Sequence, residues 1–130
     1  MDSERGAAIT IGGEEYTLIL TTKATKAIAG RYGGLENLGD RLMKAENFEL
    51  ALDEIVWLVT LLANQSVLIY NLRNKENPKP LLTEEEVELL TSPLELASYK
   101  SAITEAMMRG TARHVVSEGD AEPPKNASAG

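Results

Sequence analysis

Cysteine is absent from the chain, and histidine occurs once, as His114. The absence of cysteine excludes disulfides, thiol nucleophiles, iron–sulfur clusters and cysteine-ligated zinc, and a single imidazole excludes any multi-histidine metal site. Basic residues are also scarce, because 13 Lys and Arg stand against 20 Asp and Glu and leave a formal net charge of −7. A negative surface repels nucleic-acid phosphates and anionic lipid headgroups, so we expect no nucleic-acid partner and no membrane partner.

The N-terminal segment lacks a basic stretch followed by an apolar run, and this absence predicts a cytoplasmic protein. A length of 130 residues fits one domain with a single hydrophobic core. We expect that domain to occupy residues 7–116, after a flexible N-terminus at residues 1–6. Residues 117–130 contain no large apolar side chain that could anchor them, so they are predicted to form a disordered acidic tail.

Apolar and polar residues alternate on both sides of Gly12-Gly13, which is the pattern of a β-hairpin with a two-residue turn. The pairs that this turn predicts are Ile11 with Glu14, Ile9 with Tyr16, and Ala7 with Leu18. The apolar face of the hairpin would then carry Ile9, Tyr16, Leu18 and Leu20. An isolated hairpin is only marginally stable, so we expect this face to pack on helices.

Helical periodicity replaces the alternation from Thr22, which is expected to cap a first helix that Gly33-Gly34 ends. The remaining helices are predicted at about 35–45, at 47–72, after a capping box of Thr83 and Glu86, and from Pro93 onward. The fold class is therefore mainly α (α+β), with an N-terminal hairpin packed on a bundle of about five helices around a long central helix.

The stretch from Ile55 to Ala63 contains one polar residue in nine and leaves its helix no solvent-facing side. A membrane span would need about 20 consecutive apolar residues, which is roughly twice the length of this run. Polar residues also bracket it, with Asp53 and Glu54 before it and Asn64 and Gln65 after it. We therefore interpret the segment as the core helix of the domain.

Three features of the sequence could carry chemistry, but each has a simpler structural explanation. No nucleophile or carboxylate is fixed by spacing near His114, which lies where a helix C-terminus favours a cation. The acidic run from Glu84 to Glu88 lacks the glycines of a cation-binding loop and fits a helix start. Gly30 to Gly33 forms a G-x-x-G pattern, as in KH domains, but it also fits the end of a helix. The sequence predicts no catalytic residue, no cofactor site and no metal site.

The opening of the chain resembles the tail assembly chaperones of long-tailed bacteriophages and prophages. The matching stretches are Ile9 to Leu18 (ITIGGEEYTL), Thr22 to Ile28 (TKATKAI) and Arg31 to Leu38 (RYGGLENL). In that family a similar hairpin precedes a short helix, an aromatic-glycine turn and an "S/G-L-x-x-L" segment. The resemblance covers about residues 8–40, and the helical remainder is similar only in size and pattern.

The resemblance implies a non-enzymatic assembly factor that binds the tape measure protein, keeps it soluble and helps to recruit tail tube subunits. Such a factor acts in the bacterial cytoplasm and is absent from the mature virion. In the family, a ribosomal frameshift often appends a domain that binds the tail tube protein. Pro123-Pro124-Lys125 could be encoded by CCC-CCA-AAA, which contains a slippery heptamer. A homo-oligomer also fits a tail factor, although the sequence predicts no subunit number.

Residues chosen for expected exposure and adaptability form the predicted partner-binding set, which consists of Tyr32, Leu35, Leu38, Tyr99, Met107 and Met108. One of the two methionines is also expected to contribute to the core. Two other functions remain open from the sequence. One is a structural tail or head–tail connector subunit, and the other is a small regulatory module that binds nucleic acid through the G-x-x-G turn.

Overall fold

The computed structural model describes residues 6–34 and 48–120, with side chains described in 6–34 and 52–111. Its elements are β1 (Gly6–Ile11), β2 (Glu14–Ile19), α1 (Thr22–Tyr32), α3 (Phe48–Arg73), α4 (Glu84–Leu90) and α5 (Pro93–Asp120). The prediction of a mainly helical chain with an N-terminal hairpin is confirmed. The bundle of five helices is not, because the described residues contain four helices and the helix predicted at 35–45 lies outside them.

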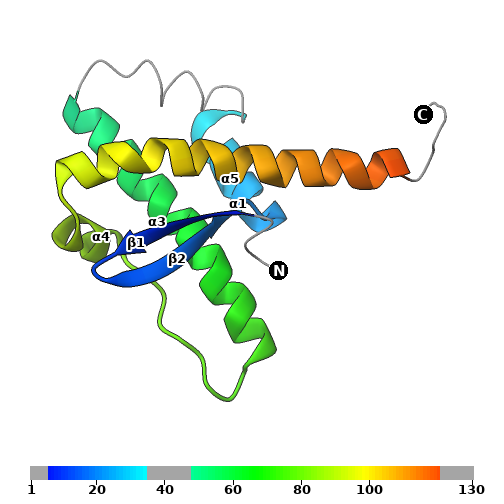
Figure 1. The fold of residues 1–130 in the computed structure, drawn as a ribbon, viewed down its shortest axis with the longest axis horizontal. Helices are drawn as coiled ribbons and strands as arrows, with labels where there is room; N and C mark the ends of the chain where they lie inside the picture. Colours follow the sequence, from blue (N-terminus) through cyan, green and yellow to red (C-terminus); the bar gives the residue numbers. More distant parts are fainter. Residues whose placement is uncertain (1–5, 35–47, 121–130) are drawn as a thin grey trace.

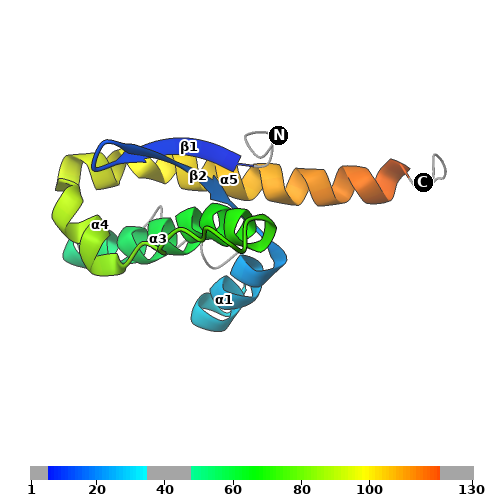
Figure 2. The same ribbon diagram turned by 90° about the horizontal axis from the view of Figure 1, so that it is seen from below.

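The two long helices, α3 and α5, cross each other, and the hairpin lies in front of α3 and alongside α5 (Figure 1). Figure 2 shows α1 on the other side of α3 from the hairpin. Helix α3 therefore lies between these elements and contacts β2, α5, α4 and α1. By length and composition Leu52–Arg73 could span a membrane, but half of its most apolar window is buried inside this domain, as expected for a core helix.

The hairpin has the predicted register, with Ile11 opposite Glu14, Ile9 opposite Tyr16, and Ala7 opposite Leu18. Gly12 and Gly13 adopt φ angles of 59° and 85°, which are the left-handed values that this two-residue turn requires. The predicted apolar face is also confirmed. Ile9 and Leu18 are buried, and Tyr16 and Leu20 pack against the core.

The N-cap of α1 lies one residue before the Thr22 predicted from the sequence. Thr21, with an extended backbone, is the N-cap, and its hydroxyl oxygen accepts a hydrogen bond of 3.0 Å from the Ala24 N–H. Thr22 is the first helical residue, so its side chain cannot take the capping position. The predicted C-terminal end is confirmed, because Gly33 has a φ of 84° and its N–H donates to the Ala29 carbonyl at 2.8 Å.

Reciprocal caps begin both helices of the C-terminal half. Thr83 and Glu86 form the predicted capping box of α4. Ser92 and Glu95 form a similar pair before α5, in which the Glu95 carboxylate accepts from the Ser92 N–H at 2.9 Å. Helix α5 continues through Asp120, so its last residues lie in the segment 117–130 for which the sequence predicts a tail.

Candidate protein-binding surface

The side of α5 that faces away from the core carries an apolar surface, which we call the outer face. Leu94 is 82% exposed and Met108 is 65% exposed. Ser101 lies between them at intervals of seven residues, or two helical turns, so the three side chains share one side of the helix. The outer face also includes a shallow recess of about 560 Å³, lined by Ala97, Ser98, Lys100, Ser101, Thr104, Glu105 and Met108.

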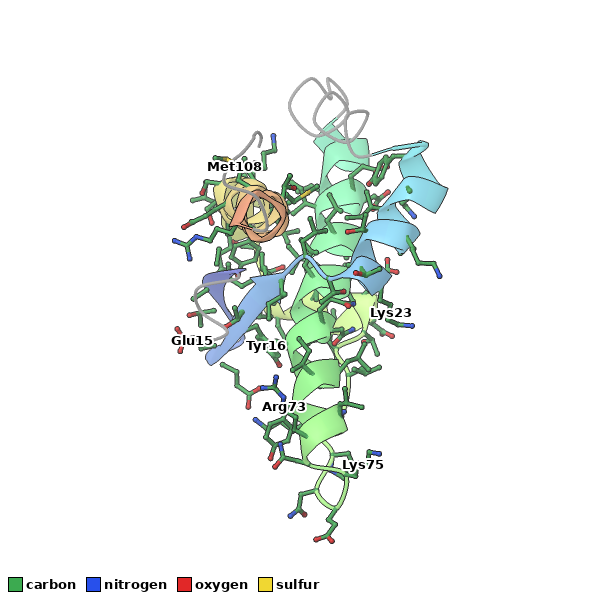
Figure 3. The ribbon with its side chains drawn as sticks, turned by 90° about the vertical axis from the view of Figure 1, so that its right-hand side faces the viewer. Glu15, Tyr16, Lys23, Arg73, Lys75 and Met108 are labelled. Atoms are coloured by element: carbon green, nitrogen blue, oxygen red, sulfur yellow. The ribbon has the colours of Figure 1, made fainter. Side chains whose placement is uncertain are left out.

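The opposite side of α5 is buried against the hairpin and α3. Leu96, Ile103 and Gly110 repeat at the same interval of seven residues, two positions after the residues of the outer face. Two positions turn a helix by about 200°, so the buried and exposed stripes lie on opposite sides. Figure 3 shows Met108 on the side of α5 directed away from α3. The small side chains of the outer face are therefore available for contact with a partner.

A second exposed apolar group lies where α4 turns into α5. Leu89 and Leu90, in the last turn of α4, are 75% and 51% exposed. A methyl group at Gly12 would lie 3.0 Å from Leu90 Cδ1, so Leu90 is next to the hairpin turn. Leu94 begins α5 a few residues later, and Figure 1 shows α4 and the start of α5 at the end of the molecule where the hairpin turns. The outer face thus starts beside a further patch of leucines.

The structure divides the predicted partner-binding set. Met108 is exposed as expected, whereas Met107 packs against the core, as expected for one of the two methionines. The expected exposure of Tyr32 and Tyr99 is wrong, because each is only 7% exposed. Both tyrosines lie on helix faces that pack against the rest of the domain. Leu35 and Leu38 lie outside the described residues.

Tyr32 belongs to a polar cluster around Glu54 of α3, a carboxylate that is 5% exposed. The Tyr32 hydroxyl donates to Glu54 Oε1, and Arg31 Nε lies 3.5 Å from the same oxygen. The Arg31 guanidinium also lies 4.4 Å from the centre of the Trp57 ring. Burial, reinforced by the bond to Glu54, raises the pKa of Tyr32 to about 12. The cluster joins α1 to α3 through the buried Glu54 carboxylate.

The sequence alone does not predict this cluster. Its pattern marks Glu54 only as one of the polar residues that precede the apolar run of α3. The partners of Glu54 come from α1, and one of them, Tyr32, lies 22 residues before Glu54 in the sequence. No local spacing signals that pairing, and only an acid at the border of a buried stretch could have pointed to it.

The other sequence candidates have structural roles where they are described. The acids at the start of α4 lie in its first turn, and Glu86 completes the cap. Gly30 lies in α1 and Gly33 ends that helix, so the G-x-x-G pattern is a helix terminus. The side chain of His114 lies outside the described part. Among the described residues, no group of three or more His, Cys, Asp or Glu side chains could hold a metal ion.

Comparison with known proteins adds no relative. No protein-family model, no curated protein and no solved structure matches the chain.

Proposed function

We propose that the protein is a non-enzymatic tail assembly chaperone of a long-tailed phage or prophage. It would bind and solubilise the tape measure protein and help to recruit tail tube subunits, in the cytoplasm of the bacterial host. The resemblance of about residues 8–40 supports the assignment to tail assembly. The local structure expected for that opening, a hairpin and a short helix ended by a glycine turn, is present in β1, β2 and α1.

The observation that carries the proposed binding activity is the outer face of α5. Leu94 and Met108 are large exposed apolar side chains, and the small residues between them would allow a partner helix to approach closely. A tape measure protein, as the resemblance implies, is long, helical and apolar along its stripes. The net charge of −7 would keep such a complex from aggregating.

Co-expression with the tape measure protein of the same phage or prophage tests the proposal. We expect the tape measure protein to be insoluble alone and to co-purify in soluble form with this protein. Light scattering of the purified complex would give its stoichiometry and show any homo-oligomer. If the tape measure protein stays insoluble while this protein elutes alone, the chaperone proposal is wrong.

Substitution of the outer face tests which surface binds. Leu94→Ser and Met108→Ser together should weaken the complex by about tenfold or more, because burial of one large apolar side chain contributes roughly 1.5–3 kcal/mol. Leu72→Ser is the matched control, since Leu72 is 69% exposed but lies near the end of α3. An equal loss of binding in the double variant and in the Leu72→Ser control would exclude the outer face as the binding site.

A structural tail or head–tail connector subunit is the main alternative function. Mass spectrometry of purified virions separates the two, because a chaperone is absent from the mature particle and a structural subunit is present. For the nucleic-acid alternative, the described residues offer little support. Gly33 caps a helix, and the adjacent Arg31 guanidinium is held between Glu54 and Trp57.

A further inference from the structure

The two edges of the hairpin differ in how they are covered. In an antiparallel pair, every second residue directs its backbone N–H and C=O away from the partner strand. In β1 these residues are Gly6, Ala8 and Thr10, because the turn makes Ile11 and Glu14 a hydrogen-bonded pair. The Tyr99 hydroxyl donates to the Thr10 carbonyl at 2.5 Å, and Arg109 Nη1 donates to the Gly6 carbonyl at 2.7 Å. Helix α5 therefore closes the outer edge of β1.

Among the described residues, none covers the outer edge of β2 with a hydrogen bond. By the same alternation, Glu15 and Thr17 direct their backbone groups away from β1. Within residues 6–34 and 48–120, no hydrogen bond to these outward groups is present. An open strand edge with free N–H and C=O groups can accept a further strand.

The open edge borders a groove of about 590 Å³ between the hairpin and the C-terminal half of α3. Glu14, Glu15, Tyr16 and Thr17 of β2 form one wall of this groove. Helix α3 contributes Ser66, Val67 and Tyr70, and the far wall is Lys79 and Pro80. In Figure 3, Glu15 and Tyr16 lie on the hairpin, with Arg73 of α3 below them.

The far wall of the groove is held in place by α3. Asn71 Oδ1 accepts from the Lys79 N–H at 2.7 Å, and Asn71 Nδ2 donates to the Lys79 carbonyl at 3.0 Å. The Lys79 ammonium lies 4.5 Å from the centre of the Tyr70 ring. These contacts keep the loop beside α3, so the space next to β2 is already formed in the free protein.

We propose that an extended segment of a partner protein, with alternating apolar and basic residues, adds to β2 as a third strand. Side chains on one side of that segment would pack over Val67 and Tyr70. Those on the other side would lie next to Glu15, which is exposed on the outer surface of the hairpin. A basic residue there gains from the opposite charge across the strands. A second copy of β2 would instead bring its own Glu14 and Glu15, and these like charges disfavour self-pairing.

This binding site is separate from the outer face of α5 and does not depend on the tail-assembly proposal. The two can fail independently, because one is tested with a helical partner and the other with an extended peptide. Binding at β2 would persist if the tape measure protein proved not to be a partner. Conversely, loss of strand binding at β2 would leave the binding of a helix to Leu94 and Met108 unchanged.

The probe is a blocked heptapeptide that alternates valine with lysine, compared with a peptide that has glutamate in place of lysine. Hydrogen exchange of the full-length protein, followed by NMR, reports on each backbone amide. We expect saturable binding of the lysine peptide and exchange at Glu15 and Thr17 that is slower by about tenfold or more. The amides of Tyr16 and Leu18 serve as internal controls, because they already bond to β1. The glutamate peptide should not bind.

Thr17→Pro tests the backbone contact directly. Proline at position 17 removes an outward N–H but no hydrogen bond to β1, so the fold should be retained while peptide binding is abolished. If this variant fails to fold, Glu15→Lys provides the second test, and it should shift the preference toward the glutamate peptide. Glu88→Lys is the matched control, because it changes the net charge equally from an exposed position on α4.

Three outcomes would overturn the proposal. The first is unchanged exchange at Glu15 and Thr17 at saturating lysine peptide. The second is equal binding of the two peptides, which would remove the charge argument. The third is a concentration-dependent dimer in which these two amides are protected without any peptide, because the occupant would then be a second copy of the chain.

Discussion

Glu54 is an acid inside an otherwise apolar part of α3, and two side chains of α1 reach it. Tyr32→Phe would remove one donor from this buried carboxylate while leaving the ring in place. We expect the free energy of unfolding to fall by about 1–2 kcal/mol, measured by urea denaturation. Tyr16→Phe is the control, because its hydroxyl donates to the exposed Glu14 and its loss should change stability little. Equal effects of the two substitutions would contradict the role given to the Glu54 cluster.

The raised pKa of Tyr32 also predicts how stability depends on alkaline pH. The folded protein keeps the phenol proton up to a pKa of about 12, whereas the unfolded chain loses it near the ordinary value of 10.0. The contribution is therefore fully present below pH 10 and is lost as the pH rises toward 12, by about 3 kcal/mol in total. Stability measured between pH 9 and 12 should fall more steeply for the wild-type protein than for Tyr32→Phe. If the two proteins lost stability in parallel over this pH range, a group other than Tyr32 would determine the alkaline pH dependence.

Two helical glycines make opposite predictions at the level of the element. A Cβ at Gly110 of α5 would lie 2.9 Å from Leu20 Cβ and 3.2 Å from the Leu20 carbonyl oxygen, so α5 can pack here only with glycine. At Gly30 of α1 nothing lies within 4 Å of the added atom. Gly110→Ala should destabilise the protein, whereas Gly30→Ala should stabilise it by up to about 1 kcal/mol through helix propensity. Thermal unfolding of both variants would show shifts of opposite sign.

Most elements could be predicted because their signals are local. Gly12-Gly13 determines the hairpin register, and Thr83 with Glu86 marks the start of α4. The burial of Tyr32 and Tyr99 could not be predicted in the same way. A tyrosine near a glycine turn or on an amphipathic helix can lie on the buried or on the exposed face of that helix. The packing of α3 against Tyr32 and of β1 against Tyr99 determines that both are buried.

The candidate surface was predicted even less completely. Met108 was included, but Leu94 was not, because nothing in the sequence shows which side of α5 faces the hairpin. The open edge of β2 was also missed. The two edges of the hairpin can be told apart only when Tyr99 and Arg109 are known to cover β1. These residues lie 89 and 103 positions from Thr10 and Gly6, the residues whose carbonyls they contact.

At the level of the whole molecule, the N-terminal hairpin depends on the C-terminal helix. Helix α5 supplies Leu96, Tyr99 and Ile103 to the core and covers the outer edge of β1. A chain that ends before Pro93 should therefore lack a cooperative unfolding transition, as followed by circular dichroism. A chain that ends after Asp120 should retain the transition of the full-length protein. A cooperative transition in the shorter chain would show that the hairpin and α3 fold without α5.

The contact between Thr10 and Tyr99 has a consequence for synthesis on the ribosome. These residues are separated by 89 positions, so β1 leaves the exit tunnel well before the helix that covers it. At about 5–20 residues per second, the hairpin waits roughly 5–20 seconds for its partner. Throughout that interval both of its edges are accessible to other nascent chains or to cellular chaperones. Translation pauses near the 3′ end of the message would prolong this vulnerable period.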